Sequence, residues 1–209
     1  IENASHEMQT PLSIIQSRLE ALIGQAELSK KQAEILEGII GSTQRLKKLS
    51  KTLLLLSKIE NRQFILSEQV DIKTILSRSM EFYEEHKAAL NISVKAETRD
   101  SLIVQGNIML TEILIQNLLK NAFLHNIENG MVSVQIMENK LIIANTGQKQ
   151  EIGKVFEKDK LFNRFYKQSS NPNTWGLGLA IALKVAETSG WGLHYYEEEG
   201  LHIFEVNFG

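Results

Sequence analysis

Hydrophobic residues at the start of the chain recur in alternating steps of four and three, the spacing of helices packed along one stripe. We expect a first helix over residues 2–23, a break near Gly24, and a second helix beginning after residues 29–31. The stripe of the first helix comprises Met8, Leu12, Ile15, Leu19 and Leu22. The stripe of the second comprises Ile35, Ile39, Ser42, Leu46, Leu49, Leu53 and Leu56. The two helices therefore form an antiparallel hairpin.

A hairpin of two helices exposes too much of its apolar stripe. Pairing two hairpins in a four-helix bundle buries both stripes, so we expect a strong homodimer. The alternating spacing stops after residues 59–64. This change places a domain boundary near residue 62, with a first domain over residues 1–62 and a second over residues 63–209.

The second domain mixes strand-like and helix-like periodicity, which predicts an α/β fold. We expect helices near residues 71–89, 107–126 and 177–189. We expect strands near residues 92–98, 101–105, 131–137, 140–145, 192–197 and 201–208. Little periodicity is visible from residue 148 to residue 175, and residues 169–174 have loop chemistry. A mobile lid over a ligand is the structure we expect there.

The polar start of the first helix carries the first candidate chemistry. His6 lies about 160° from Met8 on a helix that advances about 100° per residue. Its imidazole is therefore expected to face solvent, with Thr10 one turn along and Glu7 beside it. A lone exposed His is most often only a solvated residue. The run Ser5-His6-Glu7-Met8-Gln9-Thr10-Pro11-Leu12, however, resembles the H-box of sensor histidine kinases, in which a phosphoacceptor His precedes an acid, two variable residues, Thr and Pro.

Two asparagines interrupt a helical pattern that otherwise looks buried. Asn117 and Asn121 are four residues apart, so their amides share one helix face. Asparagine is a poor residue for a helix interior, and carboxamide oxygens suit Mg²⁺. Local capping or hydrogen bonding of the two amides is the alternative.

Three later segments also carry polar groups at places suited to a ligand. The apolar strand 141–147 ends in the polar turn Asn145-Thr146-Gly147, from which a base-reading group would project; a turn alone explains the segment equally well. Residues 176–182 open a helix with two glycines, whose backbone N–H groups can approach phosphate oxygens. Residues 161–167 are aromatic and basic. This segment is expected either to pack at the edge of the core or to flank a phosphate site.

In this order and spacing, the segments resemble the N, G1, F and G2 boxes of the histidine-kinase ATP-binding domain, the Bergerat fold shared with gyrase-type ATPases. The resemblance covers essentially all 209 residues. It implies a helical hairpin that dimerises into a four-helix bundle, followed by an α/β two-layer sandwich.

The resemblance also implies a reaction. The γ-phosphoryl group of ATP would pass to Nε2 of His6, with Glu7 fixing the Nδ1 tautomer. Mg²⁺ would be held through Asn121 with Asn117 nearby, and Asn145 would read adenine. The nucleotide-binding residues implied are Asn117, Asn121, His125, Asn145, Gly147, Arg164, Lys167, Gly176, Leu177, Gly178 and Leu179.

The same resemblance implies a partner, the receiver domain of a response regulator, whose aspartate takes the phosphoryl group from His6. In the family, a residue at the position of Thr10 orients water against the phospho-aspartate, so phosphatase activity is expected as well. The alternative is that Thr10 simply precedes Pro11 in a bent helix. Regulator choice would lie in bundle side chains such as Ser13, Gln16, Ser17 and Glu20.

Three residues depart from the family pattern. Asn145 stands where an Asp is usual, Lys149 stands where the G1 box has its second Gly, and Leu124 stands where a Lys or Arg touches phosphate. His125 is a candidate substitute for that missing cation. These departures keep open a degenerate domain that serves as a dimeric scaffold or a phosphatase. A gyrase-like ATPase without phosphohistidine is the third hypothesis, and it leaves the H-box unexplained.

Composition narrows the remaining classes. A net charge of −2 gives no basic field for nucleic acid. The chain has no Cys, which excludes disulfides and thiolate metal sites, and its five His show no zinc-like spacing. No apolar run reaches the roughly 20 residues that cross a bilayer, so this piece is expected to be soluble. It begins without Met and resembles the cytoplasmic catalytic part of a bacterial inner-membrane kinase, whose family members usually carry a sensor and membrane spans upstream.

Overall fold

The computed structural model describes residues 2–25, 28–98, 101–147, 160–167 and 175–209, and the side chains in those ranges except at 2–9 and 25. It contains two compact units, with the main division between Gln63 and Phe64. Each unit is described by itself. Within the described ranges, no helix has the length and apolar character that crossing a membrane requires.

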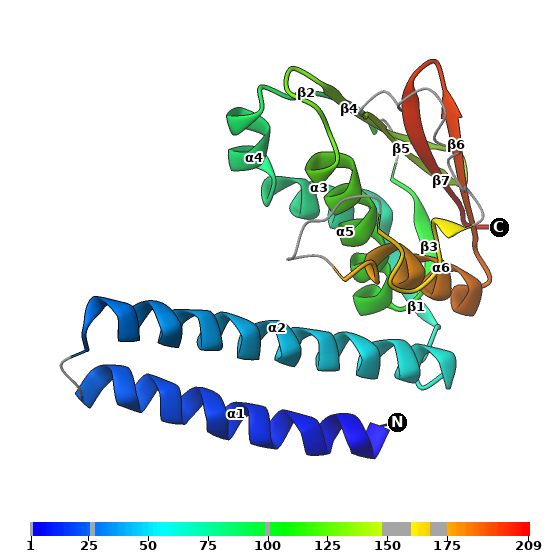
Figure 1. The fold of residues 1–209 in the computed structure, drawn as a ribbon. Helices are drawn as coiled ribbons and strands as arrows, with labels where there is room; N and C mark the ends of the chain where they lie inside the picture. The colour runs from blue at the N-terminus through cyan, green and yellow to red at the C-terminus, as the bar shows by residue number, and fades with distance from the viewer. Residues whose placement is uncertain (1, 26–27, 99–100, 148–159, 168–174) are drawn as a thin grey trace. The chain divides into compact units, whose positions relative to one another are not determined.

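The first unit is a hairpin of two long helices, α1 (Glu2–Gln25) and α2 (Lys30–Glu60), which run side by side (Figure 1). Ser29 caps the start of α2: its hydroxyl accepts from the backbone N–H of Gln32, whose side chain bonds back to Ser29. The predicted break near Gly24 is confirmed, because α1 ends at Gln25 and α2 begins at Lys30.

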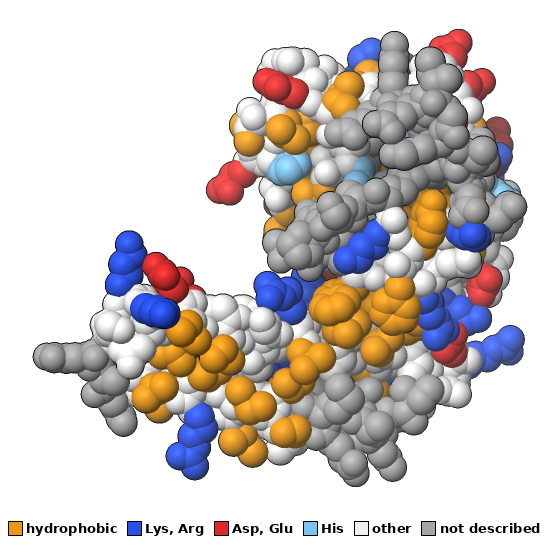
Figure 2. Space-filling view, in the orientation of Figure 1, with side chains coloured by type: hydrophobic (Ala, Val, Ile, Leu, Met, Phe, Trp, Pro, Cys, Tyr) orange, Lys and Arg blue, Asp and Glu red, His pale blue; other side chains and the backbone are white. Residues whose placement is uncertain are grey.

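The helix α2 buries a different stripe from the predicted one. The buried positions along most of its length are Leu36, Thr43, Ser50, Leu54 and Ser57. These positions have the predicted spacing, but each lies one residue after a predicted position. Near the end of α2, Leu56 of the predicted stripe is buried as well. The predicted stripe is exposed over its first half, with Ile35, Ile39 and Leu46 at 54%, 42% and 41% exposure. We call Ile15, Ile35, Ile39 and Leu46 the outer seam; they line a shallow groove between the helices, and apolar side chains gather over this hairpin in Figure 2.

The second unit is a two-layer α/β sandwich. Its helices are α3 (Ile72–Glu81), α4 (Glu84–Ala89), α5 (Ile108–Leu124) and α6 (Gly178–Ser189). Its strands are β1 (Glu68–Asp71), β2 (Ser93–Glu97), β3 (Ile103–Gly106), β4 (Met131–Met137), β5 (Lys140–Thr146), β6 (Gly192–Glu198) and β7 (Leu201–Asn207). The main sheet has the order β2-β4-β5-β7-β6, and β1 pairs with β3 in a separate antiparallel ladder. Within the main sheet β2 and β4 are parallel, and the other neighbours are antiparallel.

The core lies between the main sheet and the helices α5 and α6. Leu114, Leu118 and Phe123 of α5 are fully buried, and so are Ile143 of β5 and Phe204 of β7. Since Ile143 and Phe204 are cross-strand partners, they mark the inner face of the sheet. Every second residue of β5 and β7 shares this face, so Asn145 and His202 lie on it too.

Two features of this unit differ from prediction. The helix expected near residues 71–89 is divided into α3 and α4, although no Gly or Pro marks the division. Tyr83 lies there and stacks on Phe123, with ring centroids 4.7 Å apart, which is a tertiary contact that periodicity does not encode. The short strand β1 was not predicted, and it owes its pairing to β3 more than thirty residues away.

Candidate functional site

The helices α5 and α6 meet at Asn117 and Gly178. Asn117 Nδ2 donates to the carbonyl oxygen of Ile113 at 2.8 Å, which leaves Oδ1 directed away from that bond. A Cβ on Gly178 would lie 2.7 Å from Asn117 Oδ1. Glycine at the first residue of α6 therefore allows the amide to lie against the helix start, where backbone N–H groups lack intrahelical acceptors. The structure thus brings together two segments that the sequence treats separately.

The basic and aromatic segment 160–167 is attached to the glycines before α6. The backbone N–H of Phe165 donates to the carbonyl oxygen of Gly176 at 2.9 Å. Gly176 has φ of +63°, and a Cβ there would collide with the carbonyl oxygen of Tyr166. Arg164 and Lys167 are exposed on this segment. Two cationic side chains are therefore carried close to the start of α6.

Asn145 ends β5 with its side chain in the interior, at 1% exposure. Its Nδ2 donates to the carbonyl oxygen of Thr146 at 2.9 Å. The same amide's Oδ1 is buried and has no hydrogen-bond partner among the described residues. Because a buried unpaired acceptor costs about 1–3 kcal/mol, this oxygen is the expected place for a donor from a bound molecule.

A second polar side chain, His202, stands beside Asn145 and was missed from the sequence. The two residues are Cα partners in the β5–β7 ladder. A Cβ on Gly147 would collide with Cδ2 and Nε2 of the His202 ring, so the glycine makes room for that ring edge. The sequence offered one signal for His202: it is a polar residue in the alternating set of Phe204 and Val206, which face the core.

A hydrogen-bond network holds the end of β5 against the end of α5. Thr146 Oγ1 accepts from the backbone N–H of Met131 at 2.9 Å and donates to Asn126 Oδ1 at 2.5 Å. Asn126 Nδ2 donates to the carbonyl oxygens of Met131 and Ala122. Asn126 and Thr146 therefore position Asn145 relative to the helix that carries Asn117 and Asn121.

The remaining predicted residues of α5 lie at its last two turns. Asn121 is half-buried, and no described residue hydrogen-bonds its side chain. Leu124 is exposed at 43%. His125 caps the helix end; desolvation lowers its pKa, and the charges of His202 and Lys120 lower it further.

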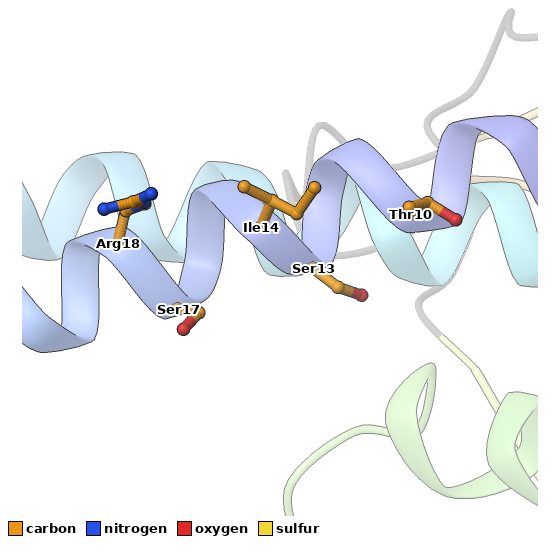
Figure 3. A pocket seen from close by; sticks show the side chains of 5 residues that line it. All are labelled: Thr10, Ser13, Ile14, Ser17 and Arg18. Carbon is orange, nitrogen blue, oxygen red and sulfur yellow. The ribbon is translucent and has the colours of Figure 1, made fainter.

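The H-box lies on α1, and His6 and Glu7 are within that helix. Their side chains lie outside the described part of the structure. So does Lys149, together with most of the lid expected over residues 148–175, of which only residues 160–167 and 175 are described. Thr10 is exposed. With Ser13, Ile14, Ser17 and Arg18 it lines a shallow hollow on the outer face of α1 (Figure 3).

Comparison with known proteins connects these features to one family. Residues 1–62 match the His Kinase A (phospho-acceptor) domain. The chain is 31% identical over 189 residues to the heme sensor protein HssS of Staphylococcus saprophyticus, which covers 90% of this chain and 41% of that protein. It is 29% identical over 209 residues to the sensor protein CutS of Streptomyces coelicolor, covering 96% of this chain and 49% of that protein. The chain thus spans less than half the length of either relative.

Solved structures show the same fold. Histidine kinase AdeS of Acinetobacter baumannii matches with a TM-score of 0.62 at 21% identity, over 98% of this chain and 97% of that one. Full-length ShkA, solved in complex with AMPPNP, matches with a TM-score of 0.73 at 19% identity, over 99% of this chain and 45% of that one. The chain belongs to the sensor histidine kinases and comprises a phosphoacceptor hairpin and the catalytic ATP-binding domain.

Proposed function

We propose that this chain transfers the γ-phosphoryl group of ATP to His6 and then to an aspartate of a response regulator. The observation that carries the nucleotide half of the proposal is the buried Oδ1 of Asn145, which has no hydrogen-bond partner within the described part of the chain. It is an acceptor suited to the exocyclic amine of adenine. The H-box of α1 supplies the other half.

In the proposed reaction, Nε2 of His6 attacks the γ-phosphorus. The Nε2–P bond forms while the bond from phosphorus to the bridging oxygen breaks, and ADP leaves with that electron pair. A neutral imidazole is available for this attack because its ordinary pKa is about 6.5. Glu7 accepts the Nδ1–H hydrogen bond and stabilises the positive charge that develops on the ring.

The α/β unit binds and orients ATP. Asn145 accepts from the base, and Gly147 in the turn after β5 makes room for the ring of His202 beside it. The backbone N–H groups of residues 177–179, opened by Gly176, contact the phosphates. Arg164 and Lys167 balance phosphate charge, and His125 contributes from the end of α5. Positioning of this kind accounts for most of the catalysis that a phosphoryl transfer requires.

Asn121 and Asn117 suit a magnesium ion. The Asn121 carboxamide has no hydrogen-bond partner among the described residues, and amide oxygens are hard ligands of the kind that Mg²⁺ accepts. When bound with ATP, the ion neutralises phosphate charge. Asn121 would hold it directly, and Asn117, which lies against Gly178, would orient the phosphates beside it.

The hairpin works as a homodimer in this proposal. Two copies that pair along the outer seam bury Ile15, Ile35, Ile39 and Leu46, which are exposed in one chain. A response regulator would dock on the outer face of α1, where Thr10, Ser13 and Ser17 line the hollow of Figure 3. Thr10 would there orient water for dephosphorylation of the regulator. We further propose that this piece acts on the cytoplasmic side of the membrane, below a sensor region.

A second candidate function is a dimeric scaffold or phosphatase that binds ATP weakly. Asn145 favours it, because a neutral amide accepts more weakly than the usual carboxylate, by the difference between a charge-assisted and a neutral hydrogen bond. The exposed Leu124, in place of a cation, favours it too.

Incubation with γ-labelled ATP and Mg²⁺ tests the proposal. We expect acid-labile, base-stable label that disappears in His6→Gln and persists in His194→Gln, whose side chain is exposed on the outer face of the sheet. Absence of label in a folded, dimeric chain would overturn the kinase proposal in favour of the scaffold or phosphatase. ATP hydrolysis that survives His6→Gln unchanged would favour an ATPase.

A further inference from the structure

We propose that His202 is a second base-reading residue, which presents Nε2 as an acceptor beside Asn145 Oδ1 and so selects a purine with a 6-amino group. This inference rests on the nucleotide-binding function proposed above. It extends that function to a residue and a chemical basis for specificity.

The first support is the arrangement of polar residues across the sheet. His202 of β7 has Asn145 of β5 as its partner on one side and Glu197 of β6 on the other. Partners in an antiparallel ladder point to the same face, with Cβ atoms about 4.5–5.5 Å apart. The neighbouring row, Ile143, Phe204 and Tyr195, is apolar apart from the Tyr195 hydroxyl. Asn145, His202 and Glu197 therefore form a polar row at one end of the inner face of the sheet, and this row includes Asn145 Oδ1.

The second support is a hydrogen-bond chain that fixes the tautomer of His202. The Tyr195 hydroxyl donates to Glu197 Oε1 at 2.8 Å, which uses its single hydrogen. The Tyr195 oxygen also lies 2.6 Å from His202 Nδ1, so the hydrogen of that contact must be on Nδ1. In the neutral ring, Nε2 is then an acceptor.

The third support is the position of the Nε2 edge. It occupies the space that a side chain on Gly147 would fill, and Nε2 forms no hydrogen bond among the described residues. The His202 side chain keeps 23% of its surface exposed, so the ring is reachable from solvent. The Nε2 edge is therefore held in place against Gly147, on a ring that keeps part of its surface exposed.

Two adjacent acceptors explain how the site can distinguish purines although Asn145 replaces the usual Asp. The 6-amino group of adenine donates two hydrogens, whereas a 6-oxopurine presents an acceptor at the same place. Oδ1 of Asn145 and Nε2 of His202 together match the amine and repel the oxo group. His202 thereby supplies selectivity that the weaker acceptor at position 145 gives up.

The test is equilibrium binding of ATP and ITP, each with Mg²⁺, to the 209-residue chain. We expect ATP to bind more tightly than ITP and the ratio to fall about tenfold in His202→Ala, the upper end of the effect of losing one neutral hydrogen bond. The matched control is His194→Ala, on the opposite face of the neighbouring strand, which should keep the ratio. Equal weakening of both nucleotides, or an unchanged ratio, would overturn the role of His202.

Tyr195→Phe keeps the ring and the apolar contacts of Tyr195 while removing the hydroxyl. We expect it to lower the ATP/ITP ratio and to shift the ¹⁵N resonances of His202 away from the Nδ1–H tautomer. Unchanged resonances would overturn the hydrogen-bond chain as the positioning device. Failure of the unsubstituted chain to bind either nucleotide would overturn the proposed function itself, whereas binding and His6 labelling without selectivity would overturn only this inference.

Discussion

The two units of this chain bury their apolar residues to very different degrees. In the α/β unit, Leu114, Leu118 and Phe123 of α5 are closed off from solvent by the sheet and the neighbouring helices. In the hairpin, the outer seam is exposed along much of its length although its spacing is as regular as that of the buried stripe. Regular spacing therefore identifies an apolar surface that packs against another surface. It does not distinguish packing within one chain from packing against a second chain.

This difference suits two different tasks. The proposed nucleotide site needs polar groups held in fixed positions, and the α/β unit holds Asn117 against Gly178. A hairpin that pairs with a second copy needs an apolar surface left open in each chain. Substitutions in each unit test whether the α/β unit buries its apolar residues within one chain and whether the hairpin buries its outer seam only in a dimer.

Leu118→Ala should give the largest effect. Removing a fully buried side chain of α5 is expected to lower the free energy of unfolding of the α/β unit by about 2–5 kcal/mol. Urea unfolding followed by circular dichroism measures it. Leu124→Ala, at the exposed end of the same helix, is the control and should change stability by less than about 1 kcal/mol. Equal losses of unfolding free energy in the two variants would contradict the burial of Leu118 in the core.

Ile39→Glu should break the hairpin's association. A carboxylate placed in the outer seam would be buried in a dimer without a partner, which costs several kcal/mol and weakens dimerisation by roughly 100-fold. Analytical ultracentrifugation measures this. Ile14→Glu, whose parent residue is exposed on α1 outside the seam, should leave the dimer intact. A dimer that survives Ile39→Glu would place the interface elsewhere.

Gly178→Ala should weaken nucleotide binding with little loss of stability. The added Cβ would lie 2.7 Å from Asn117 Oδ1, the end of a side chain, so the amide moves and the helices stay in place. We expect ATP affinity to fall about tenfold, which is about 1.4 kcal/mol. Gly41→Ala on α2 has room for its Cβ; it should leave ATP binding unchanged and stabilise the hairpin by about 0.5–1 kcal/mol. Calorimetric titration with ATP distinguishes the two variants.

Asp71→Ala should give the smallest effect, about 1 kcal/mol, the usual value of a helix N-cap. Asp71 accepts from the backbone N–H of Lys73 and from the hydroxyls of Thr74 and Ser101. These hydrogen bonds, that from Thr74 above all, lower its pKa in the folded state. The stabilisation is therefore fully present above the ordinary carboxyl pKa of about 4 and is lost as pH falls through the lowered folded value.

Urea unfolding of the unsubstituted and Asp71→Ala chains between pH 3 and pH 7 checks this sign. The difference between the two should be largest at neutral pH and should shrink below about pH 4. A difference that grows in acid would contradict the cap.

The sequence alone determined the class of this protein, because the motifs that it shares with the family are short contiguous runs. His6, Glu7, Thr10 and Pro11 are neighbours on one helix start, and the glycines at 176 and 178 stand at the beginning of another. The period of the hairpin and most elements of the α/β unit were likewise predicted, since hydrophobic periodicity reports which face of an element is buried.

Tertiary structure alone decided the rest. Two adjacent stripes of α2 have the same spacing, and only packing against α1 showed that Leu36 and Thr43 close the hairpin while Ile35 and Ile39 stay open. Strand β1, the division between α3 and α4, and the placement of His202 beside Asn145 depend on residues more than thirty positions apart. Periodicity within a segment is a local property, whereas register between strands and the choice between equivalent faces are set by contacts that form only when the chain has folded.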